Sequence, residues 1–141
     1  MSMKILLMGI MVFFSIIVFG ETGAERIKFS FEEKEIVVLL RDNSAARSLL
    51  EQLPLILKFE NYGGIEKISY PPEKLDISKA PNNYTPSAGD LTYYAPWGNL
   101  AFFHKDYRNS DGLVPLGRIE SGIENLQEIN GDFSVTIERI K

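Results

Sequence analysis

The chain has 141 residues, a formal net charge of −4, one histidine and no cysteine. The lack of cysteine excludes disulfides, thiolate metal sites and a cysteine nucleophile, and a single histidine argues against a zinc site or a Ser-His-Asp triad. The basic residues are scattered, which argues against nucleic acid or an anionic membrane surface as the main partner. Because no carboxylate pair or phosphate-binding glycine loop is present, we expect neither a metal nor a cofactor.

Residues 1–24 differ sharply in composition from the rest of the chain. Fifteen of the first 20 residues are apolar, and Lys4 precedes an uncharged run. That run is short for a bilayer span, which needs about 20 residues, whereas its order of positive charge, apolar stretch and small residues is typical of a signal peptide. Cleavage after Gly20 or after Ala24 fits, and an uncleaved membrane anchor is the alternative. We therefore expect an exported domain, periplasmic or extracellular, at residues 25–141.

The first half of this domain begins with a predicted hairpin, in which apolar residues alternate up to Phe31 and a β-branched run returns after a charged turn. Asp42, Asn43 and Ser44 offer caps for a helix that ends before Pro54. Glycines then separate two further strands. The strands predicted in this half are residues 26–31, 36–40, 55–60 and 66–70.

The second half contains a long loop at residues 71–89 and two strands around a turn that carries Trp97. A further strand precedes Ser121, which together with Glu124 matches a capping box and predicts a short helix over residues 122–128. Alternating apolar residues from Phe133 onward predict the final strand. The strands predicted in this half are residues 91–94, 99–104, 114–119 and 133–137.

About eight strands and two short helices in one domain favour an all-β fold, a compact closed or nearly closed barrel. Three motifs, Gly89-Asp90, Gly98-Asn99 and Leu116 to Ile119, occur in an order that resembles the small bacterial proteins of the cyclophilin-like fold. The resemblance extends over about residues 26–141. It implies an eight-stranded barrel with helices at its ends, in a family whose members are mostly of uncharacterised function.

True cyclophilins are peptidyl-prolyl isomerases and carry a Phe-His-Arg strand whose arginine supports the twisting imide. Here Phe103 and His104 are followed by Lys105, at a later place in the chain. The resemblance therefore implies the fold without the isomerase residues.

Aromatic residues are concentrated near the second glycine motif, and Arg108 and Arg118 are nearby cations. Aromatic and arginine side chains favour recognition surfaces, but alternate aromatics on strands also fill a barrel, and both interpretations stay open. Glu66, by contrast, is expected to be solvated. The aromatic segment comprises Tyr93, Tyr94, Trp97, Phe102, Phe103, His104 and Tyr107.

Two of these residues have a structural alternative. His104 either forms a structural hydrogen bond or contacts a ligand, and Arg118 either pairs with Glu120 or Asp90 or points its donors into a groove. The leading hypothesis is a non-catalytic module that binds a peptide, a protein or a small ligand. The alternatives are a divergent isomerase that uses Arg118 or Arg108, and a scaffold whose barrel is sealed by its aromatics. The predicted ligand-binding residues are Trp97, Phe103, His104, Arg108 and Arg118.

Overall fold

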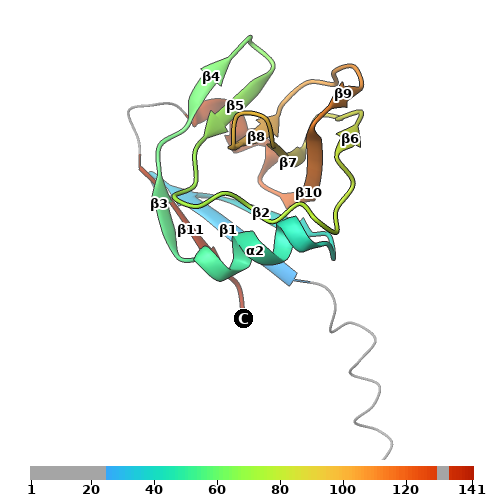
Figure 1. The fold of residues 1–141 in the computed structure, drawn as a ribbon. Coiled ribbons are helices and arrows are strands. Elements are labelled where there is room, and N and C mark those ends of the chain that lie inside the picture. Colours follow the sequence, from blue (N-terminus) through green and yellow to red (C-terminus); the bar gives the residue numbers. More distant parts are fainter. Residues whose placement is uncertain (1–24, 130–133) are drawn as a thin grey trace, which may run out of the picture.

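A computed structural model describes residues 25–129 and 134–141 of the chain (Figure 1). Its helices are α2 (Ser44–Gln52) and the 3-10 helix η2 (Ile123–Glu128). The strands are β1 (Glu25–Phe31), β2 (Lys34–Leu40), β3 (Leu55–Leu57), β4 (Glu60–Tyr62), β5 (Glu66–Ser69), β6 (Asn83–Tyr84), β7 (Asp90–Tyr94), β8 (Asn99–Phe103), β9 (Ser110–Asp111), β10 (Leu113–Ser121) and β11 (Val135–Arg139).

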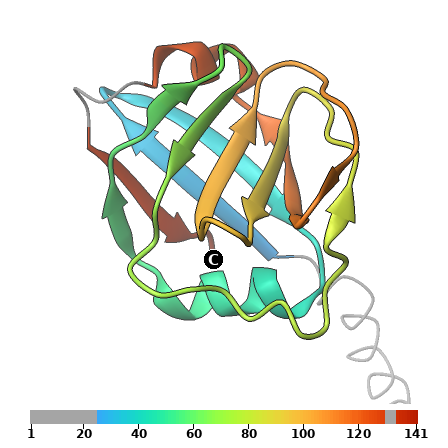
Figure 2. The ribbon, with the colours of Figure 1, turned by 45° about the horizontal axis from the view of Figure 1, so that its top comes forward.

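Nine of these strands form one antiparallel sheet in the order β3-β11-β1-β2-β10-β7-β8-β5-β4. The two edge strands, β3 and β4, are consecutive in the chain and are joined by only Lys58 and Phe59. The sheet must therefore curl until its two edges lie close together, as Figure 2 shows. The Ser69 hydroxyl donates a hydrogen bond of 2.7 Å to the Lys58 carbonyl at this seam. The predicted all-β barrel with two short helices is confirmed for the described residues.

The opening hairpin and the first helix form where the sequence predicts them. Strands β1 and β2 pair from Glu25 to Leu40, and every second residue of each strand is buried. The Asn43 side chain caps α2 by accepting a hydrogen bond from the Ala46 amide at 2.9 Å. The apolar face of α2 packs across one end of the curled sheet (Figures 1 and 2).

Two predicted elements differ from the structure. The strand expected at residues 55–60 is two strands, since β3 pairs with β11 and β4 pairs with β5. The predicted short helix is present as η2, but the capping box is wrong, because Ser121 is the last residue of β10 and Gly122, at φ 91°, is the N-cap of η2 and offers no side chain. A positive φ at Gly122 changes the direction of the chain from β10 into η2, and glycine is the residue that adopts such a φ readily.

The loops also hold more structure than expected. Strand β6 lies inside the loop predicted at residues 71–89, and it pairs with β9 to form a two-stranded ribbon. Phe133, which the sequence places in the last strand, and the predicted signal segment 1–24 lie outside the described residues. In the parts of the chain that the structure covers, no helix is long and apolar enough to cross a membrane.

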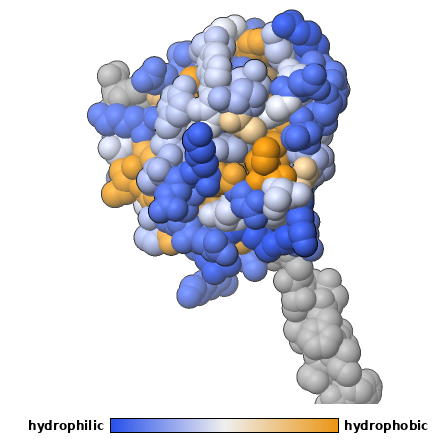
Figure 3. Space-filling view, viewed as in Figure 1, coloured by the Kyte–Doolittle hydropathy of each residue, from blue (hydrophilic) through white to orange (hydrophobic). Residues whose placement is uncertain are grey.

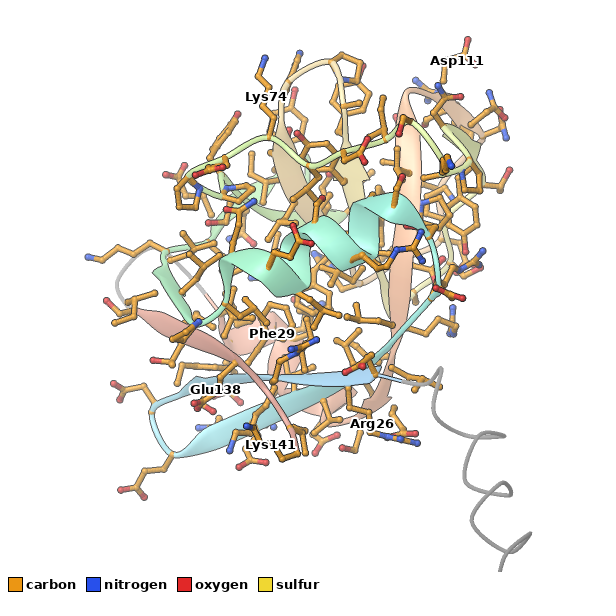
Figure 4. The ribbon with its side chains drawn as sticks, turned by 60° about the horizontal axis from the view of Figure 1, so that its bottom comes forward. Arg26, Phe29, Lys74, Asp111, Glu138 and Lys141 are labelled. Carbon is orange, nitrogen blue, oxygen red and sulfur yellow. The ribbon has the colours of Figure 1, made fainter. Side chains whose placement is uncertain are left out.

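The main core lies between the curled sheet and α2. Phe29, labelled in Figure 4, packs edge-to-face on Phe102 with ring centroids 4.8 Å apart, and Phe59 lies 6.2 Å from both. A smaller second cluster lies on the opposite face of β8 and comprises Ile68, Ala101, Phe103 and Leu113. Strand β8 is buried on both faces. Most of the molecular face seen in Figure 3 is hydrophilic, with small hydrophobic patches.

Candidate functional site

A pocket of about 440 Å³ opens over the second cluster, on the face of β5, β8 and β7 that points away from the main core. A volume of this size suits a small ligand or one side chain of a peptide. We call it the Trp97 pocket. It is lined by Tyr62, Glu66, Ile68, Tyr94, Trp97, Asn99, Phe103, Tyr107, Arg108, Asn109, Ser110, Asp111 and Leu113.

Trp97 forms an exposed aromatic corner of the pocket. Its ring packs edge-to-face against Tyr62 and against Tyr94, with centroids 5.5 Å apart in each case. The turn between β7 and β8 holds it there, because the amides of Trp97 and Gly98 both donate to the Tyr94 carbonyl. Gly98 adopts φ 77°, which a side chain would strain. Trp97 keeps 52% of its surface exposed, so it is available to a ligand.

The floor of the pocket contains a buried polar side chain. Asn99, at the start of β8, is only 2% exposed. Its Nδ2 donates to the Leu100 carbonyl at 3.0 Å, whereas its Oδ1 has no hydrogen-bond partner within the described residues. A buried acceptor without a donor carries a desolvation cost of about 1–3 kcal/mol, so such atoms in native proteins call for a partner.

Glu66 brings a carboxylate to the same pocket. It begins β5, and the sheet register places it between Tyr62 on β4 and Phe103 on β8. Burial raises the pKa of Glu66. Across residues 25–129 and 134–141, no hydrogen bond or ion pair of its side chain is found. Glu66 is half-buried in the pocket wall and is therefore less open to solvent than the sequence suggests.

The segment after β8 forms the rim. The Tyr107 ring stacks on Phe103 at 6.3 Å, and its amide donates to the Pro86 carbonyl at 3.1 Å. The Arg108 guanidinium lies 4.7 Å from the centre of the Tyr107 ring, in a cation–π contact. Asp111, on β9, is held by the Asn83 side chain and projects at the edge of the molecule far from the C-terminus (Figure 4).

The structure brings three of the five predicted site residues together, since Trp97, Phe103 and Arg108 all line the pocket. His104 does not line it. Its Nδ1 lies 2.8 Å from the Gln127 amide nitrogen and accepts its hydrogen, and its buried Nε2 has no partner among the described residues. Burial, with help from Lys67 and Lys105, lowers the pKa of His104. This histidine therefore docks η2 onto the sheet as a neutral ring.

Arg118 also lies outside the pocket. Its Nη1 is 2.5 Å from a carboxylate oxygen of Asp90, and its Nη2 donates to the Ala88 carbonyl at 3.1 Å. Asp90 is 1% exposed and accepts two further hydrogen bonds on its other oxygen, from the Tyr84 hydroxyl and the Ser87 amide, both at 2.8 Å. The ion pair that the sequence suggests with Asp90 is thus present, and it fastens the loop before β7 to β10.

Sequence reasoning missed Tyr62, Glu66 and Asn99 as pocket residues. Glu66 precedes Phe103 by 37 positions, so only the pairing of β5 with β8 brings the two together. The Gly98-Asn99 motif was a signal for Asn99, because it marks the turn that opens β8. In the described ranges no group of three or more histidine, aspartate or glutamate side chains is placed to hold a metal ion.

Comparison with known proteins supports the fold. The solution structure of a hypothetical protein from Archaeoglobus fulgidus superposes with a TM-score of 0.67 at 21% identity, over 86% of this chain and 99% of that one. No curated protein matches the chain by sequence. The sequence profile of the cyclophilin-like family matches residues 29–138. Since this match spans most of the chain, and the curled antiparallel sheet agrees with it, the chain belongs to the cyclophilin-like family.

Proposed function

We propose that this cyclophilin-like domain is a non-catalytic binding module that takes a small ligand, or a side chain of a peptide or protein, into the Trp97 pocket. The observation that carries this proposal is the combination of a half-exposed tryptophan with a concave, largely aromatic wall. Aromatic anchors at the edge of a pocket contribute much of the energy of recognition. The Ser110 hydroxyl in the lining donates to the Arg108 carbonyl at 3.2 Å, and the two carboxylates of the pocket come from separate strands, β5 and β9.

The aromatic wall is built before a ligand arrives. The edge-to-face contacts of Trp97 with Tyr62 and Tyr94 restrict its ring, and the stacking of Tyr107 on Phe103 restricts the opposite side. A binding site that is ordered in advance loses less conformational entropy when it is occupied. These contacts favour recognition over a sealed scaffold.

A second function, peptidyl-prolyl isomerisation, is favoured by one observation. Arg108 lies in the same pocket as Phe103, so an apolar surface for a proline ring and a cationic donor occur together. Arg118, the other arginine considered for this role, is engaged by Asp90 and lies outside the pocket. An isomerase of this family would therefore depend on Arg108.

Screening a fragment library by ¹H–¹⁵N spectra of the purified protein tests the binding proposal. We expect bound fragments to shift the Trp97 indole N–H, which is the only one in the chain, together with the amides that line the pocket. Trp97→Ala should weaken binding about tenfold or more, the loss expected for an anchor residue. Tyr70→Ala, which removes an exposed aromatic outside the pocket, is the control. Fragments that bind only at other surfaces would contradict the proposal.

The isomerase alternative has its own assay. The exchange rate between cis and trans forms of a short proline peptide, measured by NMR, should not rise when the purified protein is added. A clear rise that disappears in Arg108→Ala would establish the isomerase and overturn the non-catalytic proposal.

We also propose that the domain is exported, with residues 1–24 acting as its signal segment. N-terminal sequencing of the protein recovered from the periplasm or the medium should then begin at Glu21 or at Glu25, the two positions that follow the cleavage points. Recovery of a form that starts at Met1 in the membrane fraction would instead indicate an uncleaved anchor. A form that starts at Met1 in the cytoplasm would rule out export.

A further inference from the structure

Two polar groups in the lining of the Trp97 pocket are hydrogen-bond acceptors without a donor in the described residues. Asn99 Oδ1 is buried and unpartnered within the described residues. The Glu66 carboxylate is half-buried in the pocket wall, and likewise no donor to it is found in the described ranges. The Glu66 carboxylate would gain from a ligand N–H, because a half-buried carboxylate has lost part of its hydration and a hydrogen-bond donor compensates for that loss.

The aromatic corner of the pocket favours a positively charged ligand. Tyr62, Trp97 and Tyr94 present their rings around one edge of the pocket, with Trp97 packed edge-to-face between the two tyrosines. The face of an aromatic ring carries partial negative charge and attracts cations, most strongly for tryptophan. A cluster of aromatic rings beside a carboxylate is therefore suited to a cationic group and not to an anionic one.

The formal charges that line the pocket sum to a negative value. Glu66 and Asp111 are acidic, and Arg108 is the only basic side chain among the lining residues. The Arg108 guanidinium lies over the Tyr107 ring, 4.7 Å from its centre, whereas the aromatic corner is formed by Tyr62, Trp97 and Tyr94. Lys67, the neighbour of Glu66, points to the other face of the sheet, where its ammonium donates to the Gln127 carbonyl at 3.2 Å.

We infer that the Trp97 pocket binds the ammonium or guanidinium group of an organic cation, with the Glu66 carboxylate accepting its N–H donors and Trp97 covering its apolar stem. This inference rests on the proposed binding function and specifies the class of ligand. The source of the cation is either a free amine or a lysine or arginine side chain of a peptide, which share this chemistry.

The first experiment compares three probes of one shape and different charge: benzylammonium, benzyl alcohol and benzoate. Emission excited at the tryptophan band reports on the pocket alone, because Trp97 is the only tryptophan in the chain. We expect benzylammonium to bind at least about tenfold more tightly than benzyl alcohol, since hydrogen bonds to a charged group supply that factor, and benzoate to bind weakest. Equal or tighter binding of benzyl alcohol or benzoate would overturn the cation inference while leaving the binding function intact. If no probe or fragment perturbs Trp97, both fail.

The second experiment removes the carboxylate. Glu66→Gln keeps the shape of the side chain and should reduce the affinity for benzylammonium about tenfold while leaving that for benzyl alcohol unchanged. Glu60→Gln, an exposed substitution on the adjacent strand β4 outside the pocket, is the matched control and should change neither affinity. Loss of benzylammonium binding in both variants to the same degree would show a general effect of charge and overturn the role of Glu66.

The pH dependence gives an independent readout. The cation binds the ionised carboxylate, so affinity should be full above the pKa of Glu66, which burial raises, and should fall as the pH drops through it. The other ionisable groups of the pocket are Asp111, Arg108 and the phenols of Tyr62, Tyr94 and Tyr107. In Glu66→Gln this pH dependence should disappear. A pH dependence that persists in the variant would show that Glu66 is not the group responsible and would overturn the inference.

The stability of the free protein should change in the opposite direction to its affinity. Because the folded-state pKa of Glu66 is raised, its contribution to stability is present at low pH and is lost as the pH rises through that pKa. At neutral pH Glu66→Gln should therefore raise the denaturation midpoint while it weakens benzylammonium binding. A purely structural role for Glu66 predicts a lower midpoint instead.

Two further probes distinguish the sources of the cation. N-acetyl-lysine methylamide carries the side chain of a peptide, and N-acetyl-norleucine methylamide is its neutral counterpart. A peptide source predicts that the lysine compound binds more tightly than benzylammonium, because the backbone amides add contacts at the rim. A free amine as ligand predicts the reverse order. A lysine compound that binds no better than its norleucine counterpart would count against the cation inference.

Discussion

Phe102→Ala is expected to lower the free energy of unfolding by about 3–5 kcal/mol, the range for removing a buried phenylalanine. The side chain of Phe102 is fully buried, and its ring packs against both Phe29 and Phe59. Phe29 belongs to the hairpin β1–β2, and Phe59 lies in the two-residue link between the edge strands β3 and β4. The Phe102 ring therefore supports both the hairpin and the seam of the barrel. A cavity at this place cannot be filled by one local shift. Urea denaturation followed by circular dichroism measures the change.

Two companion variants make this prediction specific. Phe102→Leu keeps most of the side-chain volume and should lower the free energy of unfolding clearly less than Phe102→Ala does. Tyr70→Ala removes an aromatic ring that is 54% exposed and should leave the midpoint nearly unchanged. A loss below about 1.5 kcal/mol for Phe102→Ala would lie under the range for buried phenylalanines and would mean that the three rings do not form the centre of the core.

The parts of the fold that local sequence patterns determine were predictable. The alternation in β1 and β2 corresponds to one buried face, and Asn43 caps α2 as its residue type suggests. What the patterns did not show is that residues 55–60 belong to opposite edges of one sheet. The division of this segment into β3 and β4 depends on the strand with which each part pairs, β11 for β3 and β5 for β4. Long-range packing determines that pairing.

The site was predictable only in part, for a related reason. Composition alone identified the aromatic segment, yet alternation along β8 sends its side chains to two faces, so Phe102 enters the main core and Phe103 the pocket. His104 belongs to this segment, but its ring is held by Gln127. Arg118 is a residue type that suits a binding site, but its guanidinium is held by Asp90. Glu66 comes from a different strand, and no local pattern connects it with Phe103.

The ribbon of β6 and β9 links the pocket to the rest of the fold. Ser110 and Asp111 on β9 line the pocket, and their partner strand β6 contains Tyr84. The Tyr84 hydroxyl donates to Asp90 at the start of β7. The geometry of one pocket wall therefore depends on a carboxylate that does not line the pocket. Burial and the Asp90 hydrogen bond raise the pKa of Tyr84, so this phenol stays protonated and keeps donating at neutral pH.

Asp90→Ala is accordingly expected to lower the free energy of unfolding by about 2–4 kcal/mol, because it removes three charge-assisted hydrogen bonds accepted by one buried carboxylate. The Asp90 carboxylate accepts from Tyr84, Ser87 and Arg118, and it is 1% exposed. Asp90→Asn retains one acceptor and should cost less. Urea denaturation measures both, and amide exchange should show β6 and β9 losing protection before the nine-stranded sheet does.

The matched control is another arginine–carboxylate pair on the surface of the same molecule. Arg26 contacts Glu120 through two hydrogen bonds of 2.6 and 2.8 Å, but both side chains are about two-fifths exposed. Water and salt screen such a pair, so Glu120→Ala should shift the midpoint far less than Asp90→Ala. Equal shifts in the two variants would mean that Asp90 contributes to stability only through its charge. A larger loss for Asp90→Ala would show that the three hydrogen bonds to its buried carboxylate, which hold a wall of the pocket, carry the difference.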